Sequence, residues 1–314
     1  MYYVGIDLGG TSIKVGLVDE NGKILKKVSR PTKVERGARP VVDDMADMSL
    51  EVVKLCGVSM EEVKVIGIGL PGILDPRTGH VPFCTNLGWH DVPVIEWMQE
   101  TIDKPIFIQN DATVAGLAES VAGVSAGVKN SVFLTLGTGV GGGIVLDGKV
   151  DSGSHGVGSE LGHMITVAGG EECTCGNRGC WERYSSATAL IRMGRHAAGE
   201  RPDSLIATSV GGDLDKITAK TVIDAAKAGD ETALKVFDEY VYNLCVGLVG
   251  IINFIDPEVI VLGGGVSLAG DFLLDAVNKK LPGMIFYKTM PYAEVKLAVL
   301  GNDAGIIGAA MLGK

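Results

Sequence analysis

The alternation of apolar and polar residues predicts strands and helices that follow one another along the whole chain. Short runs rich in valine and isoleucine predict strands, and apolar residues repeated every three or four positions predict helices. The expected strands are 2–8, 13–18, 63–70, 105–109, 132–136, 144–146, 259–262 and 294–299, with one more after the turn at 19–22. The expected helices are 40–55, 92–102, 112–121, 186–198, 221–228, 233–254, 267–281 and 304–312. This mixture predicts an α/β fold.

Two glycine-rich segments share one layout of strand, glycine–threonine loop and returning strand. In the first, Gly9, Gly10 and Thr11 offer backbone N–H groups and a hydroxyl to an anion. Asp7, at the end of the first strand, would face Mg²⁺ directly or through water. A turn-forming aspartate beside two permissive glycines is the alternative for this loop taken alone. Residues 132–149 repeat the layout, which predicts two phosphate loops facing each other across a cleft.

Neither segment is a standard nucleotide-binding motif. The first lacks the G-x-x-x-x-G-K-[ST] spacing of a Walker A loop. Glycines of the second match G-x-G-x-x-G, but a strand and a hairpin turn follow them where a dinucleotide fold requires a helix. A third run, Gly263–Gly265, follows a buried strand and would let adenine touch the backbone; a glycine-rich packing turn is the alternative.

A candidate catalytic carboxylate stands between a strand and a helix. Asp111 follows the strand 105–109 and precedes the helix 112–121, where it could accept a hydroxyl proton as general base. It could equally cap the helix. The two roles are compatible if one residue of the pair Asn110–Asp111 caps the helix and the other contacts the substrate. The loop Asn86–Trp89 adds amide and indole donors that suit a polyol.

The segment from Glu160 to Glu182 has the pattern of a metal site. His163, Cys173, Cys175 and Cys180 have the spacing His-x9-Cys-x-Cys-x4-Cys, and glycines between them permit tight turns. Zn²⁺ takes four nitrogen or sulfur ligands in a tetrahedron, so the pattern predicts a closed structural zinc site. Buried or disulfide-bonded cysteines are the alternative, which a reducing compartment disfavours.

Length, charge and hydropathy narrow the class of protein. A chain of 314 residues predicts two lobes, and a formal charge of −10 disfavours a nucleic-acid surface. No signal-peptide pattern precedes the first strand, and the apolar stretch 244–255 is shorter than the ~20 residues a bilayer needs. We therefore expect a soluble, cytoplasmic protein without membrane partners. Cys56, Cys84 and Cys245 are expected to be inert core thiols.

The combined motifs resemble the ROK family of sugar kinases, within the actin/hexokinase/Hsp70 superfamily. The resemblance rests on the two hairpin loops, the late glycine run, Asn110–Asp111, residues 160–163 (ELGH), residues 173–180 (CTCGNRGC) and Glu182. It covers nearly the whole chain, and the cysteine element is its most specific part. Residues 85–89 and the short cysteine spacing are most similar to those of the bacterial glucokinases in that family.

The resemblance implies a two-lobed, actin/hexokinase-like (ribonuclease H-like) fold with an interlobe cleft. Residues 1–112 plus 303–314 would form the small N-terminal lobe. Residues 113–302 would form the large lobe, which carries the zinc site and the nucleoside loop. The implied activity is ATP-dependent phosphorylation of glucose to glucose 6-phosphate with Mg²⁺, and the implied assembly is a homodimer.

The resemblance also assigns residues to the site. Asp111 would deprotonate the 6-hydroxyl, and His163 would bind zinc with one ring nitrogen and sugar with the other. The expected sugar contacts are Gly72, Asn86, Asn110, Asp111, Glu160, His163 and Glu182. The expected ATP contacts are Asp7, Gly9, Gly10, Thr11, Lys14, Thr138, Gly139, Gly264 and Gly265. Many members have lysine where this chain has Ser12, so the cation that reaches the phosphates stays open.

Other functions remain as alternatives. The acceptor could be another hexose or N-acetylhexosamine, such as N-acetylmannosamine, N-acetylglucosamine, allose or fructose, and the donor could be polyphosphate. A sugar-responsive transcriptional regulator of this family would carry a helix-turn-helix domain before the first strand, and here that strand begins at Tyr2. An ATPase of the chaperone or actin type would have no use for the cysteine segment.

Overall fold

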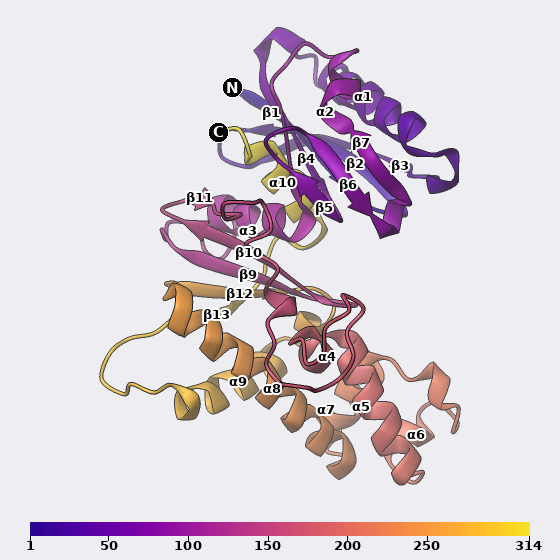
Figure 1. Cartoon of the computed structure of the whole chain (residues 1–314), viewed down its shortest axis with the longest axis vertical. Coiled ribbons are helices and arrows are strands. Elements are labelled where there is room, and N and C mark those ends of the chain that lie inside the picture. Colours follow the sequence, from indigo (N-terminus) through magenta and orange to yellow (C-terminus); the bar gives the residue numbers. More distant parts are fainter. The chain divides into compact units, whose positions relative to one another are not determined.

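The computed structural model describes all 314 residues, and the chain divides into two compact units (Figure 1). Unit 1 comprises Met1–Phe133, Gly143–Ser159 and Val299–Lys314. Unit 2 comprises Leu134–Gly142 and Glu160–Ala298. Both contain sheets and helices, so the predicted α/β class is confirmed. The lobe limits expected from the sequence stay a prediction.

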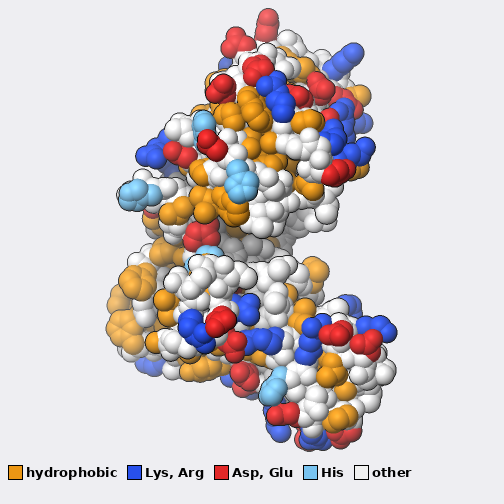
Figure 2. Space-filling model, turned by 45° about the vertical axis from the view of Figure 1, so that its right-hand side comes forward, with side chains coloured by type: hydrophobic (Ala, Val, Ile, Leu, Met, Phe, Trp, Pro, Cys, Tyr) orange, Lys and Arg blue, Asp and Glu red, His pale blue; other side chains and the backbone are white.

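The surface carries charges of both signs. On the face drawn in Figure 2, lysine and arginine side chains are interspersed with aspartate and glutamate. No continuous basic surface is visible on that face. This mixture accords with the excess of 38 acidic over 28 basic residues.

The main sheet of unit 1 has the strand order β3-β2-β1-β4-β8. Its strands are β1 Tyr2–Leu8, β2 Ser12–Asp19, β3 Ile24–Pro31, β4 Val63–Leu70 and β8 Ile106–Asn110. The first three form an antiparallel meander, whereas β1, β4 and β8 run parallel. The carboxyl ends of the three parallel strands therefore lie at one edge of the sheet, where ligands of open α/β sheets usually bind.

A small sheet in unit 1 was not predicted. It consists of β5 Ile73–Asp75, β6 His80–Cys84 and β7 Trp89–Pro93, in that order. The helix expected over 92–102 is therefore shorter, because residues 92–93 belong to β7. Trp89 was expected to offer its indole to a polyol, but its side chain is 2% exposed and belongs to the core.

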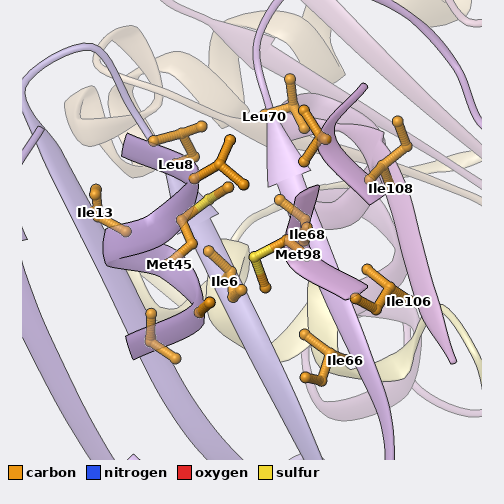
Figure 3. Packing of buried hydrophobic residues seen from close by; sticks show 14 of the residues in the cluster. Ile6, Leu8, Ile13, Met45, Ile66, Ile68, Leu70, Met98, Ile106 and Ile108 are labelled. Atoms are coloured by element: carbon orange, nitrogen blue, oxygen red, sulfur yellow. The ribbon is translucent and has the colours of Figure 1, made fainter. Parts of the chain in front are cut away.

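Four helices belong to unit 1, and they cover its main sheet. They are α1 Ala38–Leu55, α2 Val94–Gln99, α3 Asp111–Ala122 and α10 Ala304–Met311. Met45 of α1 and Met98 of α2 point toward the sheet residues Ile6 and Ile68 (Figure 3). This apolar packing holds the parallel strands and so fixes the sheet edge that carries Asp7 and Asn110.

Helix α10 packs unusually close to its neighbours, as its small residues predict. A Cβ atom on Gly5 would overlap the Ile306 carbonyl oxygen, and one on Gly67 would overlap that of Ala309. A Cβ atom on Gly308 would likewise overlap the Val114 carbonyl oxygen of α3. Helix α10 therefore packs directly against β1 and β4 of the main sheet.

A buried carboxylate fixes the point where the chain enters α10. Glu119 of α3 is fully buried, and its Oε1 accepts the backbone N–H groups of Val299 and Leu300, both at 2.9 Å. Its Oε2 accepts the N–H group of Val124 at 2.9 Å. The chain passes from unit 2 to unit 1 between Ala298 and Val299, so this carboxylate anchors the first residues of the returning segment.

Glu119→Gln is expected to lower the free energy of unfolding by about 1–3 kcal/mol. The amide has one acceptor oxygen, so in either orientation its NH₂ group faces a backbone N–H group and leaves a buried donor unsatisfied. Urea unfolding measures the change. Glu61→Gln on the exposed surface is the control and is expected to change stability by less than about 0.5 kcal/mol. Equal stabilities of the two variants would contradict the anchoring role.

The second sheet has the order β11-β10-β9-β12-β13, and the boundary between the units falls within β9 and β10. Its strands are β9 Ser131–Leu136, β10 Val140–Leu146, β11 Lys149–Val150, β12 Val259–Gly263 and β13 Glu294–Leu297. The strand–loop–strand layout predicted for residues 132–149 is confirmed. The strand β10 and then β11 follow the loop, so these glycines do not open a Rossmann helix.

Unit 2 contains the remaining α-helices. They are α4 Glu182–Ser185, α5 Ala187–Glu200, α6 Leu205–Thr208, α7 Ala219–Lys227, α8 Glu231–Ile255 and α9 Asp271–Met284. One helix, α8, is long and apolar enough to cross a bilayer. It packs against α5, α7 and α9, and Tyr240, Leu244 and Leu248 are fully buried, as in the central helix of a globular unit.

Candidate active site

The strand β8 and the helix α3 place the candidate base. Asn110 ends β8 and caps α3, since its Oδ1 accepts the N–H group of Ala112 at 2.9 Å. Asp111 is the first helical residue, and its Oδ1 also lies 2.8 Å from the Ala112 nitrogen. The choice left open by the sequence is thus resolved in favour of Asn110 as the cap. The capping bond uses the amide oxygen of Asn110 and leaves its NH₂ group available to a ligand.

The surroundings of Asp111 raise its pKa. Desolvation is the largest cause, although part of the side chain is open to solvent, and the negative charge of Asp7 adds to it. The hydrogen bond from Ala112 opposes the shift. A carboxylate with a raised pKa is a stronger base, which suits removal of a hydroxyl proton.

Asp7 and Lys14 form an ion pair at the end of β1. The two residues are partners across the β1–β2 hairpin, and Lys14 Nζ lies 3.0 Å from Asp7 Oδ2. Gly305 of α10 leaves room for the carboxylate, because a Cβ atom there would lie 2.6 Å from Asp7 Cγ. Lys14 is therefore positioned to balance the charge of Asp7.

The predicted phosphate loop of unit 1 lies against the predicted sugar loop. Gly9 closes a tight turn by donating its N–H group to the Ser12 carbonyl at 3.0 Å. A Cβ atom on Gly10 would lie 3.2 Å from the Asn86 carbonyl oxygen. Gly72 has a φ of +102°, and a Cβ atom there would lie 2.7 Å from the Phe83 carbonyl. Only glycine suits that position, which packs beside the strand that leads to Asn86.

The predicted zinc ligands of unit 2 converge. The ligand atoms of His163, Cys173, Cys175 and Cys180 all lie within 4.8 Å of one another. Cys175 Sγ is 3.6 Å from Cys180 Sγ, and Cys173 Sγ is 3.8 Å from His163 Nδ1. With Zn–S bonds of about 2.3 Å and Zn–N bonds of about 2.0 Å, a tetrahedron has S–S and S–N edges of roughly 3.5–3.8 Å. The cluster therefore fits a structural zinc ion.

A short hairpin brings the three thiols together. The N–H group of Cys173 donates to the Asn177 carbonyl at 2.8 Å, and the N–H group of Gly176 donates to the Cys173 carbonyl at 3.0 Å. Gly176 has a φ of +91°, which favours glycine. The next residue after the hairpin, Trp181, is fully buried, and its Nε1 donates to the Asn243 carbonyl of α8 at 2.8 Å. The hairpin is thus anchored to the core of unit 2.

Glu182 connects the metal cluster with the second phosphate loop. Its Oε1 lies 3.1 Å from Cys173 Sγ and 4.0 Å from His163 Nδ1. Its Oε2 lies so close to Gly139 that a Cβ atom on that glycine would overlap it. The predicted sugar residue Glu182 therefore touches both the predicted zinc site and the predicted ATP loop.

The two ATP loops predicted in unit 2 also lie together. Thr138 accepts a hydrogen bond at its carbonyl from Thr188 Oγ1 at 2.7 Å, which attaches the loop to the first turn of α5. Gly264 has a φ of +83°, and a Cβ atom there would lie 2.6 Å from the Leu136 nitrogen, directly before that loop. Gly264 and Gly265 are exposed beside it.

Some residues of the site carried no sequence signal. Gly305, which makes room for Asp7, lies in a helix already explained by packing. Thr188, which holds the Thr138 loop, is one hydroxyl among many. Their roles depend on contacts between segments far apart in the chain.

Comparison with known proteins identifies the family. The sequence profile of the ROK family matches residues 3–314. A glucokinase of Thermotoga maritima is 40% identical over 310 residues, covering 98% of this chain and 96% of the relative. The crystal structure of a ROK family glucokinase from Streptomyces griseus, in complex with glucose and AMPPNP, is 33% identical with a TM-score of 0.81 and 99% coverage of both chains.

The ROK hexokinase from Thermus thermophilus is 34% identical, with a TM-score of 0.86, and the match covers 99% of this chain and 97% of that one. These matches confirm the predicted two-lobed, actin/hexokinase-like fold. The chain therefore belongs to the ROK family.

Proposed function

We propose that the chain is an ATP-dependent glucose kinase. The observation that carries this proposal is the Asp111 carboxylate, whose raised pKa and place at the carboxyl edge of the sheet suit it to deprotonate a sugar hydroxyl. The similarity to glucokinases over essentially their full length supports glucose as the acceptor and ATP as the donor.

Asp111 acts as general base in the proposed reaction. It takes the proton of the 6-hydroxyl while that oxygen forms a bond to the γ-phosphorus of ATP, and the bond from phosphorus to the β–γ bridging oxygen breaks to release ADP. Phosphoryl transfer has a loose transition state, so alignment of the two oxygens contributes most. Gly72, Asn86 and the free NH₂ group of Asn110 would hold the sugar near this base.

The phosphates would meet the two glycine loops. Gly9, Gly10 and Thr11 offer donors from unit 1, and Thr138 and Gly139 offer donors from unit 2. Gly264 and Gly265 would approach adenosine. Mg²⁺, when bound, neutralises phosphate charge, and the Asp7 carboxylate is a hard oxygen ligand that suits it. Lys14, already paired with Asp7, is the cation we assign to this region.

The zinc site would orient the sugar contacts. His163 presents Nδ1 to the thiols, which leaves Nε2–H as a donor for a sugar hydroxyl. Glu160 and Glu182 would accept from neighbouring hydroxyls at the same end of the ring. Zinc has a structural function in this proposal and takes no part in phosphoryl transfer.

The proposal includes the setting of the enzyme. We place it in the cytoplasm as a homodimer without a membrane partner, and its charge of −10 disfavours a nucleic-acid partner. Residues 1–112 plus 303–314 and residues 113–302 are the proposed functional lobes.

A coupled ADP-release assay over a panel of hexoses and amino sugars tests the function. We expect glucose to have the highest kcat/KM, with ATP preferred over polyphosphate as donor. Preference for an N-acetylhexosamine, allose or fructose would replace glucose as the acceptor. Absence of turnover with every sugar would overturn the kinase proposal.

A further inference from the structure

A loop behind the candidate base is attached to it by a buried amide. Gln109 precedes Asn110–Asp111 and is 6% exposed. Its Nε2 donates to Ser152 Oγ at 2.7 Å, and its Oε1 accepts the Asn110 N–H group at 2.8 Å. The end of β8 is thereby tied to a segment more than forty residues further along the chain.

A second buried pair attaches the other end of the same loop. Thr113 Oγ1 and Ser159 Oγ are 3.2 Å apart, and the two residues are 1% and 7% exposed. Gln109 and Thr113 flank Asp111, while Ser152 and Ser159 delimit the loop 152–159. Both ends of this loop are therefore bonded to the residues on either side of the base.

Hydrogen bonds hold this loop in place, because apolar packing contributes little to it. The loop closes on itself where Gly158 donates its N–H group to the Ser152 carbonyl at 2.7 Å. Its one large apolar residue, Val157, is 48% exposed. A cavity of about 270 Å³, lined by Gln109, Ser152, Gly153 and Ser154 among others, lies beside it. Loss of a bonded end would therefore free the loop.

We propose that the Gln109–Ser152 and Thr113–Ser159 pairs are positioning residues for the sugar pocket. Ser159 directly precedes Glu160, the first residue of the segment that ends in His163. By holding the loop against the strand end and helix that carry Asp111, the pairs fix where that segment begins. This inference rests on the proposed kinase function and assigns the pairs no contact with sugar.

The two hydrogen-bonded pairs should increase the affinity of the protein for the hexose. A sugar contact that is held in place before binding costs less ordering entropy when the ligand arrives. Releasing the loop adds that cost to hexose binding, whereas the nucleotide loops keep their own hydrogen bonds. The KM for the hexose should therefore change more than the KM for ATP.

Ser152→Ala and Ser159→Ala test the inference. Each removes one hydroxyl, and we expect the KM for glucose to rise about 2- to 10-fold with the KM for ATP unchanged. Hydrogen exchange followed by mass spectrometry should show faster exchange in residues 153–163. Ser152→Thr keeps a hydroxyl and should restore both values.

Ser49→Ala is the matched control. Ser49 is a fully buried serine of unit 1 whose hydroxyl donates to the Met45 carbonyl within α1, at 2.7 Å. It should lose stability without a change in glucose KM or in exchange at 153–163. If Ser152→Ala and Ser159→Ala behave like this control, the positioning role is wrong.

The exchange measurement separates this inference from the proposed function. If the wild-type chain phosphorylates a different hexose, the same variants are compared with that sugar. If it phosphorylates none, faster exchange at 153–163 in both loop variants still supports the attachment, and unchanged exchange overturns it.

Discussion

Replacing Asp111 with asparagine is expected to lower kcat about 10²- to 10⁴-fold, the usual contribution of a general base. Asparagine has nearly the same shape and can still accept the N–H group of Ala112, which Asp111 contacts at 2.8 Å. The cap of α3 is unaffected because Asn110 provides it. The variant should therefore fold normally and bind glucose, while the proton of the 6-hydroxyl has no acceptor.

The pH dependence of turnover offers an independent test of the same role. The base works only when ionised, so activity should fall as pH decreases through the pKa of Asp111. Desolvation, and then the charge of Asp7, raise that pKa above the ordinary aspartate value of about 3.9. In the wild type, kcat should therefore begin to fall at a higher pH than an aspartate of ordinary pKa would give. The residual activity of Asp111→Asn should not show this fall at low pH.

Asp111→Asn should lower activity, but it should not lower the stability of the folded protein. A folded-state pKa above the unfolded value means that the native state disfavours the ionised form, so this carboxylate lowers stability as pH rises through that range. At neutral pH, Asp111→Asn should melt at the same temperature as the wild type or higher. Asp103→Asn, in the exposed loop before β8, is the control and should leave kcat unchanged. Near-normal turnover in Asp111→Asn would remove Asp111 from the role of base.

Elements with a strong local pattern could be predicted from the sequence to within a residue. The strands Tyr2–Leu8 and Val63–Leu70 agree with the prediction at both ends, because each is a nearly continuous apolar run on a buried sheet. Segment 73–93 could not be predicted in this way. Its strands are short, and Ile73 and Phe83 are 54% and 41% exposed, so no clear alternation marks them.

The same distinction applies to the candidate site. The four zinc ligands could be identified because one short segment contains them all. The Gln109–Ser152 bond could not, because it joins segments far apart and neither residue type indicates a partner. The capping residue of α3 also needed the structure, because asparagine and aspartate cap helices about equally well.

Removal of zinc is the second change with a large expected effect. Structural zinc contributes on the order of 10 kcal/mol to folding in small zinc domains. Here Trp181 also anchors the hairpin to α8, so we expect local unfolding of residues 165–180 rather than collapse of unit 2. Cys180→Ser alters a fully buried ligand and should eliminate stoichiometric zinc, as measured by elemental analysis. Limited proteolysis should then cut within the hairpin.

Cys245→Ala is the matched control for Cys180→Ser. Cys245 is also a fully buried cysteine of unit 2, but it lies in α8 outside the cluster. Its substitution should cost packing energy and leave zinc content unchanged. Zinc-depleted wild-type protein must be kept reduced, because Cys175 and Cys180 lie close enough to react with each other once the metal is absent.

The effect of zinc loss on the reaction follows from the position of Glu182. This carboxylate lies beside Cys173 on one side and Gly139 on the other, so a disordered hairpin should disturb the sugar contacts and the second phosphate loop together. We expect the KM for glucose to rise most, the KM for ATP to rise less, and kcat to fall. A preparation that contains no zinc but keeps normal kinase activity and an intact hairpin would contradict the predicted tetrahedral zinc site. In that case Glu182 would have to be positioned by the packing of Trp181 alone.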